Sequence, residues 1–172
     1  VVELALNPPA QDASLNQTFD VDIIADTKGY DITGVAAYVN FDPTYVIVDS
    51  ITPGSTLGTV IGKTFDNNNG TLGFSAGEMN QPYPNGVLTV ATITFIASAE
   101  TPDNFPTELT FNDSGQRITN AGFGGESLLK SATGATVTVI SGFVDFTVTL
   151  QGGSRPNPAG WEIPVTLNFH TQ

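Results

Sequence analysis

Short runs of alternating apolar and polar residues, separated by glycine and proline, extend along the whole chain. Phe19, Val21 and Ile23 alternate with Asp20 and Asp22, which predicts a strand with one buried face. No window shows the 3.6-residue period of an amphipathic helix, and turn residues interrupt the apolar runs about every ten positions. The pattern therefore predicts an all-β sandwich or barrel with little helix.

The strands that we expect are rich in β-branched and aromatic residues and are bounded by turn residues. In the longest of them, Val87, Thr89, Ala91, Ile93 and Phe95 are predicted to share one face. The expected strands are Val2–Leu6, Thr18–Ala25, Ile32–Phe41, Val46–Ile51, Thr59–Ile61, Thr71–Ala76, Gly86–Ala97, Thr107–Phe111, Ala135–Ile140, Phe143–Leu150 and Trp161–Phe169.

The last expected strand has the strongest alternation. Trp161, Ile163, Val165, Leu167 and Phe169 occupy every second position, after a breaker-rich connection at residues 152–160. Because each large side chain gains about 1.5–3 kcal/mol on full burial, this apolar face requires a surface to cover it. The strand could fold back on its own domain, enter the groove of a neighbouring copy, or belong to a larger multidomain protein.

Length and composition limit the remaining possibilities. A chain of 172 residues is sufficient for one well-buried domain, which we place at residues 1–141, with residues 142–172 as a C-terminal strand extension. The net charge of −12, with only five basic residues, argues against nucleic acid and anionic membrane surfaces as partners. The absence of cysteine excludes disulfides and thiolate metal sites.

The start of the chain and its hydropathy bear on localisation. The sequence has no long apolar run, so we expect no membrane insertion. It begins Val-Val-Glu without methionine, which we interpret as a processed, secreted form. Asn16, Asn69 and Asn112 are in glycosylation sequons, which matter only in an organism that glycosylates them.

Aspartate and asparagine are abundant, and their short oxygen ligands suit calcium better than zinc or copper. Asp20 and Asp22 share one strand face and could approach a common ion if a neighbouring strand supplied a further acid, for which Asp145 is the candidate. Two loops could also bring carboxylate and carbonyl oxygens together. The loop candidates are Asp66 with Asn67 and Asn68, and Asp103 with Asn104. None of these groups has EF-hand spacing, and each could equally consist of solvated turn or strand residues.

The motifs of common enzymes are absent. The chain has no cysteine nucleophile, Gly-x-Ser-x-Gly elbow, Walker loop or His-Glu-x-x-His motif, and its one histidine, His170, is on the polar side of the last expected strand. We therefore predict a non-catalytic protein. A sugar-binding surface would require a row of exposed aromatic rings, and of the four tyrosines only Tyr38 is on a strand face that we expect to be exposed.

The order of three segments is similar to that of a known family. A Phe-Asp-Pro turn at residues 41–43, an Asn-Gly-Thr hairpin at residues 69–71 and a long strand that begins Gly-Val-Leu at residues 86–88 follow the expected strand at residues 19–23. In this order, over about the first 140 residues, the chain resembles the cohesin-like family of β-sandwiches. The resemblance implies a jelly-roll sandwich of about nine strands, related to carbohydrate-binding modules, to which residues 142–172 add two further strands.

The resemblance also implies non-catalytic adhesion, in which a sheet face captures a calcium-binding dockerin. The sequence contains no dockerin-type calcium loop of its own. Combining the family resemblance with the C-terminal strand, we expect an extracellular structural protein that forms a calcium-stabilised fibre by strand donation, with Trp161 to Phe169 filling the acceptor groove. The alternative is a binding module of a cell-surface scaffold that captures a dockerin-type partner or a polysaccharide.

Overall fold

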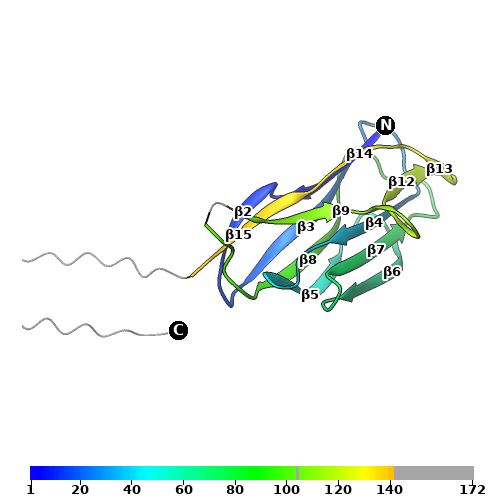
Figure 1. Cartoon of the computed structure of the whole chain (residues 1–172). Coiled ribbons are helices and arrows are strands. Elements are labelled where there is room, and N and C mark those ends of the chain that lie inside the picture. Colours follow the sequence, from blue (N-terminus) through cyan, green and yellow to red (C-terminus); the bar gives the residue numbers. More distant parts are fainter. Residues whose placement is uncertain (104, 142–172) are drawn as a thin grey trace, which may run out of the picture. The chain divides into compact units, whose positions relative to one another are not determined.

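The computed structural model describes residues 1–103 and 105–141, which form a β-sandwich without helices (Figure 1). The all-β prediction is confirmed. The strands are β1 (Val2–Asn7), β2 (Ala10–Ser14), β3 (Thr18–Asp26), β4 (Gly34–Asn40), β5 (Val46–Pro53), β6 (Thr59–Asp66), β7 (Thr71–Gly77), β8 (Val87–Ala97), β9 (Thr107–Phe111), β10 (Asp113–Ser114), β11 (Arg117–Ile118), β12 (Asn120–Phe123), β13 (Glu126–Ser127), β14 (Leu129–Thr133) and β15 (Ala135–Ile140).

Two sheets contain nearly all of these strands. The first sheet has the order β14-β1-β3-β8-β5, and the second has the order β13-β12-β4-β9-β15-β2, extended from β4 by β7 and then β6. Most pairs are antiparallel, whereas β1 pairs with β14 and β15 pairs with β2 in parallel. Strands β10 and β11 form a separate short hairpin. β5 and β6 are thus edge strands of opposite sheets.

The core lies between the two sheets and follows the predicted alternation. In β3, Val21 and Ile23 are fully buried, whereas Asp20, on the alternate face of the strand, is exposed. In the facing sheet, Phe74 of β7 is buried opposite Ala37 of β4. No buried side-chain nitrogen or oxygen among the described residues lacks a hydrogen-bond partner. The packing therefore leaves the outer faces of both sheets free for polar or functional residues.

A bulge in β8 changes one predicted face. The register against β3 shifts between Ile23, opposite Ala91, and Ile24, opposite Thr89, so that Val90 is an extra residue in β8. Val90 and Ala91 are consequently both buried, while Val87 is 72% exposed. The prediction that Val87 and Thr89 share the face of Ala91, Ile93 and Phe95 was therefore wrong, because strict alternation ends at the bulge.

The sequence pattern did not predict several of the observed strands, and it predicted one of them too short. β6 continues to Asp66, beyond the expected end at Ile61, and β2, β12 and β14 were not expected. These strands lie at or near sheet edges and are mostly exposed, so their sequences show little of the alternation that burial of one face imposes. Backbone pairing rather than side-chain burial defines them.

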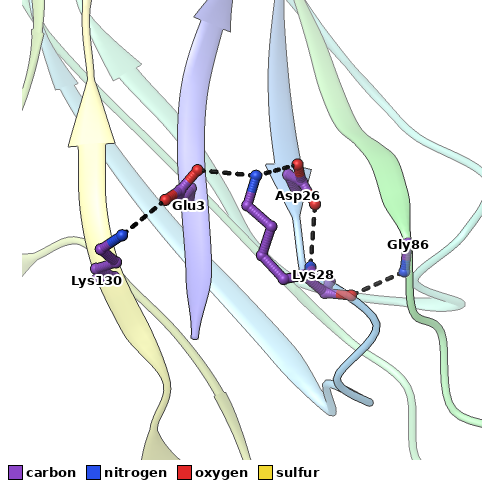
Figure 2. A network of polar contacts seen from close by, with 6 residues as sticks. Glu3, Asp26, Lys28, Gly86 and Lys130 are labelled. Carbon is purple, nitrogen blue, oxygen red and sulfur yellow. Dashed lines mark hydrogen bonds and ion pairs between the residues drawn. The ribbon is translucent and has the colours of Figure 1, made fainter.

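An ion-pair network joins three strands of the first sheet (Figure 2). The Lys28 ammonium lies 3.0 Å from the Glu3 carboxylate of β1 and 2.5 Å from the Asp26 carboxylate at the end of β3. Glu3 also pairs with Lys130 of β14 at 3.2 Å. Hydrogen bonds from Lys28 are the main reason that the pKa values of Glu3 and Asp26 lie below their ordinary range. The network thus links β3 to β1 and β14, the parallel pair of strands at one edge of this sheet.

Candidate functional site

The outer face of β6, β7 and β4 has a floor of small residues. Register places Gly34 and Ala36 of β4 beside Gly77 and Ser75 of β7, and Gly62 of β6 also lies beside Ser75. In β4 and β7 the alternate residues, such as Val35 and Ala76, are buried, which directs this face of the sheet toward solvent. A Cβ atom on Gly62 would lie 2.9 Å from the Ser75 hydroxyl oxygen. The sequence therefore gives this part of the sheet a low, accessible surface.

Two side chains from outside the floor border this surface. The register shift in β6 between Val60 and Gly62 turns Ile61 out of the ladder, and its side chain is 72% exposed. On the other side, the β12–β13 hairpin contributes Glu126. The space between them is about 240 Å³ and is the sheet-face groove. Its lining also includes Thr33, Gly34, Val35, Ala36, Ser75, Ala76, Asn120, Ala121, Gly122 and Gly125.

Tyr38 and Arg117 close one end of the same face. The Tyr38 ring lies so close to β7 that a Cβ atom on Gly73 would be 2.9 Å from it, and the Arg117 guanidinium lies over the ring, 5.4 Å from its centroid. Arg117 also donates hydrogen bonds to the Leu72 carbonyl at 2.9 Å and to the Asn40 side-chain oxygen at 2.9 Å. Tyr38 is on the outer face, as predicted, but it is half-buried beneath Arg117.

Arg117 is a functional candidate that the sequence pattern did not predict. It forms no ion pair within residues 1–103 and 105–141, although the chain is strongly acidic. Its guanidinium lines a second depression of about 240 Å³, which also includes Thr64 and Asp66. A single basic residue in a short polar hairpin has no sequence signal that would connect it to Tyr38, 79 positions earlier. The juxtaposition is visible only in the folded chain.

Asp20 and Asp22, the predicted calcium pair, lie on the outer face of the other sheet. Each carboxylate accepts a hydrogen bond from the threonine opposite it in β8, Thr94 at 2.7 Å for Asp20 and Thr92 at 2.6 Å for Asp22. On the β1 side, Asp22 faces Asn7 rather than an acid. Across the part of the chain that the structure describes, no group of three or more histidine, cysteine, aspartate or glutamate side chains is placed to hold a metal ion.

The loop candidates for calcium have separate surroundings. One carboxylate oxygen of Asp66 accepts hydrogen bonds from the backbone amides of Asn68 and Asn69, at 2.8 Å and 3.2 Å. The other accepts one from the Asn69 side chain, at 2.6 Å. These contacts lower the pKa of Asp66, and the hydrogen bond from the Asn69 side chain contributes most. They also explain the position of the Asp66 carboxylate in the turn without a bound ion. Asp103 is exposed beside residue 104, which lies outside the described residues.

The remaining predicted site residues belong to residues 142–172, outside the described part of the chain. They are the possible calcium ligand Asp145 and the predicted polymer-interface residues Trp161, Ile163, Val165, Leu167 and Phe169.

Comparison with known proteins identifies the sandwich. A family model, described as the cohesin domain, matches residues 4–122, more than half of the chain. This chain belongs to the cohesin family. The resemblance proposed from the sequence is confirmed, and so is the jelly-roll sandwich that it implied. A search of curated proteins found no match.

Solved cohesin structures share the fold at low sequence identity. The third cohesin of ScaC from Acetivibrio cellulolyticus, solved with the ScaB dockerin, is 18% identical with a TM-score of 0.66, covering 82% of this chain and 100% of that one. The seventh ScaB type I cohesin from Pseudobacteroides cellulosolvens is 12% identical with a TM-score of 0.65, covering 86% and 97%. A non-cellulosomal cohesin from Archaeoglobus fulgidus is 12% identical with a TM-score of 0.62, covering 81% and 91%.

Family membership also bears on catalysis. Cohesin domains are non-enzymatic scaffold or binding modules, so the prediction that this protein is not an enzyme is confirmed. Within the described residues, the cohesin domain has no helix long and apolar enough to cross a membrane. The sheet-face groove between Ile61 and Glu126 is the candidate site on this domain.

Proposed function

We propose that this cohesin domain is an extracellular scaffold module that captures a dockerin-type partner in the sheet-face groove. The observation that carries the proposal is the groove itself, a floor of glycine, alanine and serine beside the exposed Ile61 side chain. A low floor lets the backbone of a partner element approach closely, and a projecting apolar side chain can serve as an anchor. Two of the similar solved cohesins, from Acetivibrio cellulolyticus and Clostridium thermocellum, are complexes with dockerins, which supports this partner class.

The groove favours a protein partner over a polysaccharide. Sugar-binding surfaces commonly present open aromatic faces for stacking, and the Tyr38 ring is covered by the Arg117 guanidinium. No aromatic side chain from residues 1–103 or 105–141 lines the groove itself. A dockerin-type partner would bring its own calcium, so this mode of capture requires no metal ligand from Asp20 or Asp22.

A pair of matched substitutions tests the position of the site. Ser75→Arg places a long charged side chain on the groove floor, whereas Ser50→Arg makes the same change on the outer face of the other sheet, where Ser50 lies opposite Thr94. The test uses dockerin modules from the organism that produces this chain, titrated by calorimetry. Ser75→Arg should weaken capture by about 30-fold or more, the factor that corresponds to loss of a 2 kcal/mol interface hot spot.

The control variant makes the result interpretable. Ser50→Arg should bind like the unchanged protein, and both variants should retain the circular dichroism spectrum and melting temperature of a folded sandwich. Equal loss in both variants, or loss only in Ser50→Arg, would place the partner elsewhere.

A second function, a fibre assembled by strand donation, is favoured by the sequence of the C-terminal extension. The alternating apolar residues from Trp161 to Phe169 would fill an acceptor groove of a neighbouring copy, and the contact repeats head to tail because it is heterologous. Calcium held by Asp20, Asp22 and Asp145, or by the Asp66 and Asp103 loops, would stabilise such a fibre. This proposal is independent of dockerin capture.

Light scattering behind size exclusion tests the fibre, in millimolar calcium and in EDTA. The full chain should form large species that become smaller in EDTA, and a chain ending at Gly152 should be monomeric. Polymers unaffected by EDTA would remove calcium from the proposal. A full chain that is an 18.0 kDa monomer in both buffers would contradict strand donation, and so would a shortened chain that still polymerises.

A further inference from the structure

A separate pocket lies where the β3–β4 connection meets the β12–β13 hairpin, next to the sheet-face groove. The β3–β4 connection contributes Tyr30 and Asp31, and the β12–β13 hairpin contributes Phe123 and Glu126, with Leu128 directly after it. The pocket is an open depression of about 410 Å³, a volume within the range of sites that bind small molecules or single side chains. We call it the aromatic pocket. Glu126 also lines the sheet-face groove, so the two surfaces are neighbours.

The aromatic side chains of this pocket are held in place but remain accessible. Phe123 packs edge-on against Tyr83, with ring centroids 5.2 Å apart and planes at 89°, and is 39% exposed. Tyr30 is 52% exposed. Thr33 joins the loops, because its amide donates to the Gly122 carbonyl at 2.8 Å and its hydroxyl accepts from the Gly124 amide at 3.0 Å. The pocket thus exists before any ligand binds.

The polar side chains of the lining are almost entirely hydrogen-bond acceptors. Asp31 and Glu126 are carboxylates, and Tyr30 adds one phenol. One oxygen of Asp31 accepts a hydrogen bond from Asn85 at 2.7 Å, whereas Glu126 has no hydrogen-bond or ion-pair partner for its carboxylate among the described residues. Among the described residues, no lysine or arginine lines the pocket.

This chemistry selects the kind of ligand. A sugar hydroxyl can donate to these carboxylates, but its own oxygen would find only the Tyr30 phenol as a side-chain donor among the lining residues. A lysine ammonium or arginine guanidinium only donates, is attracted to aromatic faces, and carries an apolar stem that Leu128 can cover. The net charge of −12 attracts the same ligand.

We propose that the aromatic pocket binds a lysine or arginine side chain of a polypeptide partner, between the rings of Tyr30 and Phe123 and the carboxylates of Asp31 and Glu126. Because Glu126 borders both surfaces, a partner in the sheet-face groove can place a basic side chain in the pocket. That connection rests on the proposed function. The ligand preference of the pocket does not.

The test uses small probes, so it needs no partner protein. The full chain, labelled with ¹⁵N, is titrated with N-acetyl-lysine methylamide and N-acetyl-arginine methylamide while amide chemical shifts are recorded. The uncharged analogue N-acetyl-citrulline methylamide and cellobiose are the comparison probes. The cationic probes should shift the amides of Tyr30, Asp31, Phe123 and Glu126 with millimolar affinity, and the affinity should fall as salt is added.

Variants assign the contributions of the ring and the charge. Phe123→Leu and Glu126→Gln should each weaken the cationic probes by about fivefold, the factor expected for one exposed cation–π or ion-pair contact. Glu108→Gln, an exposed acid of β9 outside this pocket, should have no effect.

The outcomes separate this proposal from the proposed function. Equal binding of the citrulline probe, shifts by cellobiose alone, or absence of shifts with every probe would overturn the pocket proposal. Dockerin capture that is lost in Ser75→Arg would still stand in each of these cases. Conversely, cationic probes that bind while no dockerin does would retain the pocket and contradict only the groove.

Discussion

Gly70 occupies a position where both backbone conformation and space exclude a side chain. Its φ is +65°, in the left-handed region, and a Cβ atom there would collide with the Phe41 carbonyl and lie 2.8 Å from Pro43 Cδ. Gly70 also accepts the backbone hydrogen bond from the Phe41 amide at 2.8 Å. Glycine is therefore required in the Asn-Gly-Thr hairpin, because the hairpin packs against the Phe-Asp-Pro turn. Both segments contributed to the family resemblance.

Gly70→Ala should lower the free energy of unfolding by about 2–4 kcal/mol, since it adds a backbone collision to the cost of positive φ. Gly124→Ala is the matched control, because Gly124 has φ +58° and a Cβ atom there would have no neighbouring atom within 4 Å. The control should cost only about 1 kcal/mol from strain. Urea denaturation of both variants measures the difference. Equal costs would show that the Phe41 contact contributes nothing.

The Lys28 network makes stability depend on pH in two windows. Because the pKa values of Glu3 and Asp26 are lowered, mainly by hydrogen bonds from Lys28, their contribution is present above the ordinary values of 4.5 and 3.8 and is lost as pH falls through the folded-state values. The pKa of Lys28 is raised, mainly by the hydrogen bond to Asp26, so its contribution is present below 10.5 and is lost as pH rises beyond it.

Lys28→Met should reduce both the acid and the alkaline loss of stability relative to the unchanged protein. The measurement is the free energy of unfolding in urea between about pH 2 and pH 11, at low salt because the pairs are exposed. Lys63→Met, which removes a lysine without an ion pair in the described residues, is the control. Identical pH profiles for Lys28→Met and the unchanged protein would show that the network does not couple to folding.

At the scale of elements, the edge of β5 is closed by a side chain from the β6–β7 turn. The register of β5 shifts between Val48 and Ser50, and Asn67 bonds to the backbone at this bulge. Its side-chain oxygen accepts from the Val48 amide at 2.8 Å, and its side-chain nitrogen donates to the Val48 carbonyl at 2.9 Å. Asn67 thus imitates a neighbouring strand and protects an edge that could otherwise pair with another chain.

Asn67→Ala should cost about 1–2 kcal/mol, because it leaves both backbone groups of Val48 without a partner at a half-closed edge. Asn68→Ala changes the exposed neighbour and should remain within about 0.5 kcal/mol of the unchanged protein. Chemical denaturation compares the two, and light scattering should show more self-association for Asn67→Ala alone. If Asn67→Ala left the free energy of unfolding unchanged, water would satisfy the Val48 backbone groups as well as the Asn67 side chain does.

The elements also show why the sequence predicted the core better than the site. β3 and β4 bury one face each, so their alternation is complete and their strands were predicted. The sheet-face groove depends on glycines that have no periodic signal and on the β6 bulge at Ile61. The second depression depends on Arg117 reaching Tyr38 from a distant hairpin. Such features arise from tertiary register, which local pattern does not encode.

At the scale of the whole molecule, the described residues combine one β-sandwich with two different outer faces. The first sheet presents Asp20 and Asp22 bonded to threonines, which accounts for these acids without requiring an ion. The second sheet presents the sheet-face groove, with the aromatic pocket beside it. Calcium binding stays a prediction, as does strand donation by residues 161–169. Partner capture on the second sheet is our proposal, and the sheet-face groove is the observation that supports it.

Amide hydrogen exchange, with and without a saturating dockerin module from the same organism, tests the central claim most directly. The account predicts slower exchange on binding in β4, β6 and β7, at residues 34–40 and 59–77, and unchanged exchange in β3, β5 and β8. Protection confined to β3, β5 and β8 would contradict capture in the sheet-face groove. If none of the organism's dockerin modules protected any strand, dockerin capture itself would be contradicted.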